Sequence, residues 1–220
     1  MKNVLIVTYY FPPYGGGAVI RIHNFVKYLP KFGFLPIVLT VKEKYYEKTY
    51  STPTLLDEYS EKIAINRVNS FEFIGSKAKS RIYGIREKTF GDKVFTYPVK
   101  ILVDKVLVPD GTILWAPHAL LHGRKIIRNN GIDIIFSTAP PFSSHIIAYL
   151  LHKISGKPFV VDYRDDWIRH RPYRKLNGDV RFRLAKRLEY MLVKDASKVI
   201  TSTHESIELF KGKYPHINTD

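Results

Sequence analysis

A cluster of acidic, basic and aromatic side chains follows a short apolar run near residue 160. Residues 160–167 read VVDYRDDW. In an open α/β sheet, ligands bind where the parallel strands end. Carboxylates accept hydrogen bonds from hydroxyl groups, and the Trp167 indole offers an apolar face to a sugar ring. The pattern therefore predicts sugar recognition by Asp162, Arg164 and Trp167. A structural ion network between Arg164 and one of the acids is the alternative interpretation.

The three carboxylates of this segment also raise the question of a metal ion. Asp162, Asp165 and Asp166 carry the hard oxygen ligands that Ca²⁺ and Mg²⁺ prefer. Consecutive residues on an extended backbone point to opposite sides, however, so adjacent acids do not converge on one ion. The sequence has no cysteine, and its eight histidines do not show the spacing H-E-x-x-H. We expect no metal and no bound cofactor.

Three consecutive glycines, Gly15, Gly16 and Gly17, lie between the first apolar run and a helical pattern. A glycine-rich turn from strand to helix presents free backbone N–H groups at the positive end of a helix dipole, which suits a phosphate group. The dinucleotide fingerprint G-x-G-x-x-G and the phosphate-loop lysine are both missing. A tight turn with close packing would also account for the glycines.

A third polar segment, FSTAPPFSSH at residues 136–145, also leads from an apolar run into a helical pattern. Hydroxyl and N–H groups at such a helix start, here with Ser143 and His145, either bind a ligand or cap the helix. The segment PDGTILW contains Asp110 and Trp115 and reads as a turn. We expect this turn to border the same ligand-binding cleft at the strand ends.

Short apolar runs alternate with amphipathic helical patterns along the chain. This alternation predicts an α/β fold, a Rossmann-like three-layer sandwich with a mainly parallel sheet. We expect strands at residues 4–8, 36–40, 63–68, 132–137, 159–163 and 199–203. We expect helices at residues 18–29, 140–154, 184–192 and 204–214. Residues 41–125 are less regular, and the apolar stripe after Pro98 fits a helix on the sheet or on a lipid surface.

The composition is that of a basic globular chain. The 220 residues include 35 Lys and Arg against 20 Asp and Glu, a formal net charge of +15. This charge predicts an anionic partner, such as nucleic acid, a phosphorylated ligand or an anionic lipid surface. The alternative is a basic protein surface that has no specific partner. No signal peptide is recognisable, and charged residues interrupt each apolar stretch before the roughly 18 residues of a membrane span.

The order of the motifs carries a resemblance to a known family. FPPYGGGAVIR, PDGTILW, FSTAPPFSSH, KPFVVDYRDDW and ASKVITST follow one another along the chain. In this order they resemble the amino-terminal domain of family 4 retaining glycosyltransferases of the GT-B fold. The resemblance implies that residues 1–220 are one Rossmann-like domain with a helical and loop insertion at about 70–125. The carboxyl-terminal nucleotide-sugar domain would be absent from this chain, and the fragment would be inactive alone.

The resemblance also assigns roles to particular residues. The main-chain amides of Gly15–Gly17 would approach the donor diphosphate, and Arg21 would add charge one helical turn later. Asp165 or Asp166 would be the catalytic residue that orients the attacking hydroxyl. The acceptor-binding residues would be Asp162, Arg164, Trp167, Ser143, His145, Asp110 and Trp115. Many relatives carry a histidine near this strand end, where this sequence has Arg164 and Asp165, so the proton acceptor is left open.

The resemblance further implies the reaction and its setting. The whole enzyme would transfer a sugar, as a hexosyltransferase, from a nucleotide-sugar to a lipid-linked or cell-envelope glycan acceptor with retention. The leaving diphosphate would help to take the acceptor proton in a front-face displacement. The basic, aromatic-rich domain would be a cytoplasmic, peripheral protein held at the anionic inner face of a membrane. No nucleic-acid partner is expected.

Two other functional classes explain part of the sequence. A basic nucleic-acid-binding module would account for the charge, but no helix-turn-helix, zinc-finger or RNA-recognition signature is present. Another nucleotide-binding Rossmann-like protein would account for the fold. Against it, the dinucleotide fingerprint is missing and no acidic residue ends the second expected strand, which reads VLTVK at residues 38–42.

Overall fold

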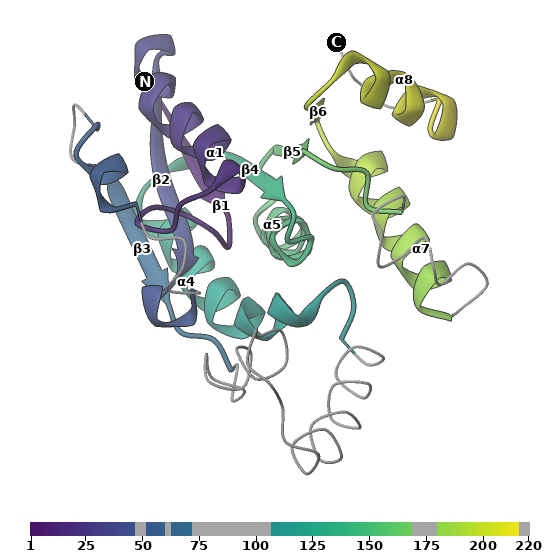
Figure 1. Cartoon of the computed structure of the whole chain (residues 1–220), viewed down its shortest axis with the longest axis horizontal. Coiled ribbons are helices and arrows are strands. Elements are labelled where there is room, and N and C mark those ends of the chain that lie inside the picture. The colour runs from purple at the N-terminus through teal and green to yellow at the C-terminus, as the bar shows by residue number, and fades with distance from the viewer. Residues whose placement is uncertain (47–51, 60–62, 72–106, 169–179, 216–220) are drawn as a thin grey trace, which may run out of the picture.

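The protein folds around one parallel sheet, which forms the middle layer of the molecule (Figure 1). The computed structural model describes residues 1–46, 52–59, 63–71, 107–168 and 180–215. Within them, six strands are arranged in the order β3-β2-β1-β4-β5-β6. The strands are β1 (Lys2–Val7), β2 (Phe34–Val41), β3 (Ala64–Val68), β4 (Ile132–Ala139), β5 (Phe159–Tyr163) and β6 (Lys198–Thr201). The expected α/β Rossmann-like fold and its six strands are confirmed.

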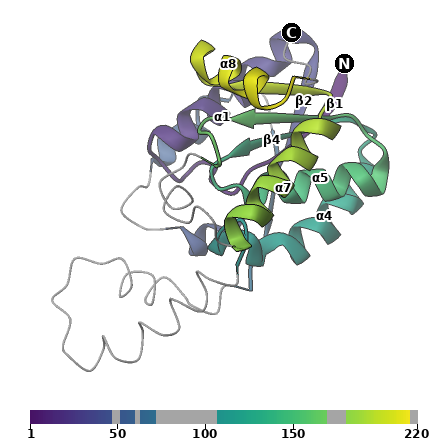
Figure 2. The same cartoon turned by 90° about the vertical axis from the view of Figure 1, so that its right-hand side faces the viewer.

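Helices cover both faces of the sheet. The α-helices are α1 (Gly17–Tyr28), α4 (Ala116–Asn129), α5 (Ser143–Ser155), α7 (Val180–Asp195) and α8 (His204–Lys213). The short 3₁₀ helices are η1 (Leu29–Phe32), η2 (Glu43–Tyr45), η4 (Pro53–Leu56) and η5 (Gly111–Trp115). Figure 2 shows the sheet between α1 on one side and α4, α5 and α7 on the other.

Each face of the sheet has its own apolar core, because successive residues of a strand point to opposite faces. On the α1 side, Ile6 of β1 and Val38 of β2 pack against Ile22 and Val26. The core on the other side contains residues of β1, β2, β4 and β5 together with residues of α4, α5 and α7. The central strands are therefore buried on both faces, which explains why they read as continuous apolar runs.

The sheet has a topological switch point between its two central strands. Strand β1 pairs in parallel with β2 on one side and with β4 on the other. The segments that leave the carboxyl ends of β1 and β4 therefore lead to helices on opposite faces. Open α/β sheets bind ligands in the crevice at such a point.

Two helices differ from the sequence-based expectation. Helix α5 begins at Ser143 rather than at Pro140, because prolines lack the N–H group and restrict the residue before them. Helix α4 begins in the segment 41–125, for which the sequence predicted helix and loop character without placing this helix, and it packs on α5. A Cβ atom at Gly123 of α4 would lie 2.6 Å from Cδ1 of Leu151, so glycine permits this close packing. The stripe expected after Pro98 lies outside the described residues.

None of the described helices combines the necessary length with sufficient apolar character to cross a bilayer.

Candidate functional site

Three loops meet at one edge of the sheet. They follow the carboxyl ends of β1, β4 and β5, which run in parallel. Hydrogen bonds join the loops directly: the Tyr9 N–H donates to Ser144 Oγ at 3.1 Å, and the Arg164 N–H donates to the Ala139 carbonyl at 3.1 Å. We call this edge the strand-end rim, defined as residues 14–21, 139–143 and 162–167. The expectation that these segments converge on one edge is confirmed.

The triple-glycine turn leaves the start of α1 open. Gly16 and Gly17 are exposed, whereas Gly15 is buried. Gly16 has a φ of 91°, which only glycine adopts readily, and no side chain caps the first turn of α1. A Cβ atom at Gly16 or Gly17 would meet no atom within 4 Å among the described residues. The turn therefore leaves room for an external group beside the amides of the helix start.

Arg21 and Asp162 form an ion pair within the strand-end rim. Arg21 Nη2 lies 2.8 Å from Asp162 Oδ1, and Arg21 Nε lies 3.1 Å and 3.2 Å from the two carboxylate oxygens. Thr138 Oγ1 donates to Asp162 Oδ2 at 2.8 Å, and Arg21 Nη2 also donates to the Thr201 carbonyl at 3.3 Å. The Asp162 side chain is fully buried, and 31% of the Arg21 side chain is exposed.

The sheet geometry explains this contact. Val160 of β5 packs in the core on the α1 side, and Asp162 points to the same face two residues later. Thr138 lies opposite Asp162 in the register of β4 and β5. The ion pair therefore fastens the first turns of α1 to three strands. Our sequence analysis assigned Arg21 to the donor and Asp162 to the acceptor, and the structure brings the two into direct contact.

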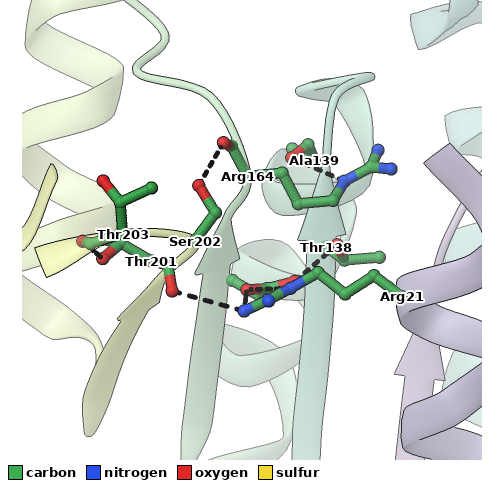
Figure 3. Close-up of polar contacts among 8 residues, drawn as sticks. Arg21, Thr138, Ala139, Arg164, Thr201, Ser202 and Thr203 are labelled. Carbon is green, nitrogen blue, oxygen red and sulfur yellow. Dashed lines mark hydrogen bonds and ion pairs between the residues drawn. The ribbon is translucent and has the colours of Figure 1, made fainter. Parts of the chain in front are cut away.

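Arg164 points toward the loop after β4. Its Nε donates to the Ala139 carbonyl at 3.2 Å, its Nη2 donates to the Pro140 carbonyl, and Ser202 Oγ donates to the Arg164 carbonyl at 2.8 Å (Figure 3). Burial lowers the pKa of Arg164, while the nearby Asp162 and Asp165 carboxylates act in the opposite direction. A guanidinium remains charged at neutral pH. Arg164 therefore places a fixed positive charge beside the carbonyls of the β4 loop.

The two neighbouring acids of the rim have different surroundings. Asp165 is exposed. Asp166 instead accepts from Lys213 Nζ of α8, which lies 3.0 Å from both carboxylate oxygens. The same Nζ lies 3.2 Å from the fully buried Glu189 of α7, which also accepts from the Tyr214 hydroxyl at 2.6 Å. Asp166 therefore connects the rim to α7 and α8, whereas the carboxylate of Asp165 faces solvent.

Two of the predicted acceptor-binding residues, one in the rim and one just after it, are buried. Trp167 is fully buried, and its ring stacks on Phe142 with a centroid distance of 4.9 Å. His145 is also fully buried, and its Nδ1 lies 2.7 Å from Ser137 Oγ. Burial, together with the charge of Arg164, lowers the pKa of His145 to about 3. The imidazole is therefore neutral at neutral pH, and these rings support the loops from the core side.

Asp110, the rim residue Ser143 and Trp115 form a second, largely buried polar group. Asp110 Oδ1 accepts from the Thr112 N–H at 3.2 Å, and Oδ2 accepts from the Ser143 N–H at 3.1 Å. Ser143 Oγ lies 2.5 Å from Thr112 Oγ1 and 3.4 Å from Trp115 Nε1. Burial raises the pKa of Asp110, and the hydrogen bonds it accepts oppose this shift. These contacts attach η5 to the start of α5.

Our sequence analysis did not select two residues that contribute to the rim. Thr138 donates to the buried Asp162 carboxylate, and Thr201 offers its carbonyl to Arg21. The order of strands and their register bring these residues together, and both follow from pairing across the sheet rather than from a local motif. Among the described residues, no group of three His, Cys, Asp or Glu side chains could hold a metal ion.

No protein-family model matches the sequence, and no curated protein matches it. Two solved structures share its fold over 100% of this chain. One is sucrose-phosphate synthase (tll1590) from Thermosynechococcus elongatus, with a TM-score of 0.60 and 10% identity. The other is Phytolacca americana UGT2 complexed with UDP-2fluoro-glucose and pterostilbene, with a TM-score of 0.58 and 11% identity.

The match covers 47% of the sucrose-phosphate synthase chain and 52% of the UGT2 chain. The present chain therefore spans about half the length of these structures. At such low identities, the likeness shows the fold alone.

Proposed function

We propose that these 220 residues are the acceptor-side half of a glycosyltransferase, with the strand-end rim as their part of the active site. The observation that carries the proposal is the convergence of an open glycine turn, an ion pair between a partly exposed arginine and a buried carboxylate, and an exposed carboxylate at the switch point of one parallel sheet. The proposal is supported by the fold that this chain shares with about half of the sucrose-phosphate synthase chain and about half of the UGT2 chain in complex with UDP-2fluoro-glucose. The second domain, which would bind most of the nucleotide-sugar, would lie outside this chain.

The glycine turn is proposed to face the diphosphate of the donor. Exposed Gly16 and Gly17 leave the main chain open to a close approach, and the first turn of α1 carries no acidic side chain that would repel an anion. In the reaction, negative charge develops on the leaving diphosphate. Preorganised N–H groups aimed at this charge stabilise the transition state, and such stabilisation is usually the largest single contribution to catalysis.

Arg21 is proposed to add only weakly to the positive electrostatic potential at the glycine turn. Its guanidinium is already paired with Asp162 and is partly exposed, so it contributes an oriented dipole more than a net positive charge. Neutralisation by Asp162 has a second consequence. The donor diphosphate can leave the turn without breaking a strong new ion pair, because the arginine keeps its own carboxylate partner.

Asp165 is proposed to orient the attacking hydroxyl of the acceptor. The resemblance assigned this role to Asp165 or Asp166. Asp165 is exposed, whereas Asp166 forms an ion pair with Lys213. The transfer would proceed with retention, and the leaving diphosphate would help to accept the hydroxyl proton. We infer a lipid-linked or cell-envelope glycan as acceptor and a peripheral position on an anionic cytoplasmic membrane face, motivated by the net charge of +15.

The experiment that tests the proposal measures sugar transfer and hydrolysis by the gene product as expressed in its source, with a panel of nucleotide-sugars and a lipid-linked acceptor. At least one nucleotide-sugar should be consumed, and the 220-residue chain alone should consume none. If the gene product uses no nucleotide-sugar, the assignment is wrong. Tight binding of short RNA or DNA that weakens steeply with salt would instead favour a nucleic-acid-binding protein.

A further inference from the structure

A basic groove lies between α7 and the end of α8, and its lining residue Lys213 also contacts Asp166 of the strand-end rim. Its cavity volume is about 730 Å³. Small-molecule sites in proteins typically occupy about 300–1,000 Å³. The lining residues are Arg183, Lys186, Arg187, Tyr190, Val193, Lys194, Lys213, Tyr214 and Pro215. Its size and shape thus suit a small organic ligand.

Most of the cations of this groove have no carboxylate partner. Arg183, Lys186, Arg187 and Lys194 are exposed and form no ion pair with any described residue. They recur along α7 at a spacing that places them on neighbouring positions of one side of the helix. Lys213 differs, because Asp166 and Glu189 neutralise it. The groove therefore carries a surplus of positive charge that its own wall does not balance.

The other part of the lining is apolar and aromatic. The rings of Tyr190 and Tyr214 lie 6.0 Å apart, and 49% of Tyr190 is exposed. The hydroxyl of Tyr214 donates to Glu189 at 2.6 Å, which fixes this ring in place. Val193 and Pro215 complete the apolar part of the lining. A ligand that fits both parts has an anionic head and an apolar body.

We propose that this groove binds a phosphate-headed amphiphile. The phosphate would contact Arg183 and Arg187, because a guanidinium donates two parallel hydrogen bonds to phosphate oxygens and is weakly hydrated. The apolar body would lie against Tyr190 and Tyr214. The inference deepens the membrane part of the proposed function, because an anionic lipid is one source of such a ligand, but it involves neither a nucleotide-sugar nor a transfer step. Sugar transfer without binding at this groove would contradict this inference alone, and binding at the groove without any sugar transfer would contradict the proposed enzyme alone.

The test measures binding of octyl phosphate to the 220-residue chain by isothermal titration calorimetry. Octyl glucoside, which has a similar tail and no charge, should bind much more weakly. The double variant Arg183→Gln/Arg187→Gln should weaken octyl phosphate binding about tenfold, which corresponds to two exposed ion pairs of about 0.7 kcal/mol each. The matched control Arg124→Gln/Lys125→Gln removes two exposed cations from α4 and should leave binding unchanged.

Two further measurements separate the parts of the ligand and its source. Tyr190→Ala should weaken octyl phosphate binding and leave inorganic pyrophosphate binding unchanged. Co-sedimentation with phosphatidylcholine vesicles, with and without phosphatidic acid, asks whether the amphiphile belongs to a bilayer. Vesicle binding that requires phosphatidic acid and is lost in Arg183→Gln/Arg187→Gln would support the proposal with a lipid source, even without binding of monomeric octyl phosphate.

Three results would overturn the proposal. The first is that neither octyl phosphate nor the anionic vesicles bind. The second is an equal loss in both double variants, which would mean that only total charge matters. The third is full octyl phosphate binding by Tyr190→Ala, which would remove the apolar part of the site. Thermal unfolding of each variant checks the fold, and exposed substitutions of this kind should change stability little.

Discussion

Arg21 of α1 and Asp162 of β5 form a bidentate ion pair, although 141 residues separate them in the sequence. The carboxylate is fully buried and also accepts from Thr138 of β4. The first helix is thus attached to the far half of the sheet at the edge where the loops meet. This contact therefore fixes the position of the glycine turn relative to β5.

The first prediction concerns the stability that this pair provides. Arg21→Leu should lower the free energy of unfolding by about 2 kcal/mol, because it leaves a buried carboxylate without its partner; solvent screening of the partly exposed arginine keeps the loss below that of a fully buried pair. Adding Asp162→Asn to this variant should restore part of the loss. Urea denaturation measures both effects, and strictly additive losses would contradict the coupling.

The second prediction separates two neighbouring glycines. Gly16→Ala should lower the free energy of unfolding by about 2 kcal/mol, because a φ of 91° strains any residue with a Cβ atom. Gly17→Ala lies in the first helical turn without strain and should change stability by less than about 1 kcal/mol. Under the proposed function, Gly17→Ala should still raise the KM for the nucleotide-sugar in the active enzyme. An unchanged KM would argue against a diphosphate at this turn.

The third prediction concerns the pH dependence of stability. The pKa of His145 is about 3 in the folded protein, against 6.5 for an ordinary histidine. Between these values the unfolded chain binds a proton that the folded protein does not, so stability falls as the pH falls. From about pH 7 to about pH 5, wild type should lose about 2 kcal/mol more than His145→Gln. Parallel pH profiles of the two proteins would show that His145 does not contribute.

The sequence was sufficient to predict the strands, but not all of the helices. Residues of β1 and β2 are apolar on both faces, and this signal needs no knowledge of their partners. Helix α4 gave a weaker signal because its buried positions are Ala119, Gly123 and Ile126, two of which are small. The reason for Gly123 is its contact with Leu151, which depends on how α4 and α5 pack.

The sequence predicted where the candidate site lies, but it did not predict which side chains contact one another there. Strand ends are recognisable from apolar runs, so the meeting of three loops could be foreseen. As an alternative to sugar binding, the sequence suggested a pairing of Arg164 with an acid of its own segment, and it did not predict a partner for Asp162 on the first helix. The structure instead pairs Asp162 with Arg21, because the alternation along β5 directs Asp162 toward α1. Which neighbour a side chain meets depends on sheet order, and a local motif does not contain that order.

The last prediction distinguishes two adjacent acids by their surroundings. Asp166 is tied to Lys213, and only 11% of its side chain is exposed, so Asp166→Asn should lower the free energy of unfolding by about 1 kcal/mol. Asp165 is exposed, and Asp165→Asn should leave stability unchanged. If Asp165 orients the attacking hydroxyl, Asp165→Asn should lower kcat of the active enzyme by about a hundredfold. Asp166→Asn should retain most of the activity at a temperature where it is folded.

Steady-state kinetics and urea denaturation of the same preparations would show which of the two acids orients the attacking hydroxyl. A retained kcat in Asp165→Asn, together with a loss in Asp166→Asn that exceeds its loss of folded protein, would reverse the assignment. The carboxylate held by Lys213 would then be the one that acts on the acceptor, and the contact between α8 and the rim would serve catalysis as well as stability.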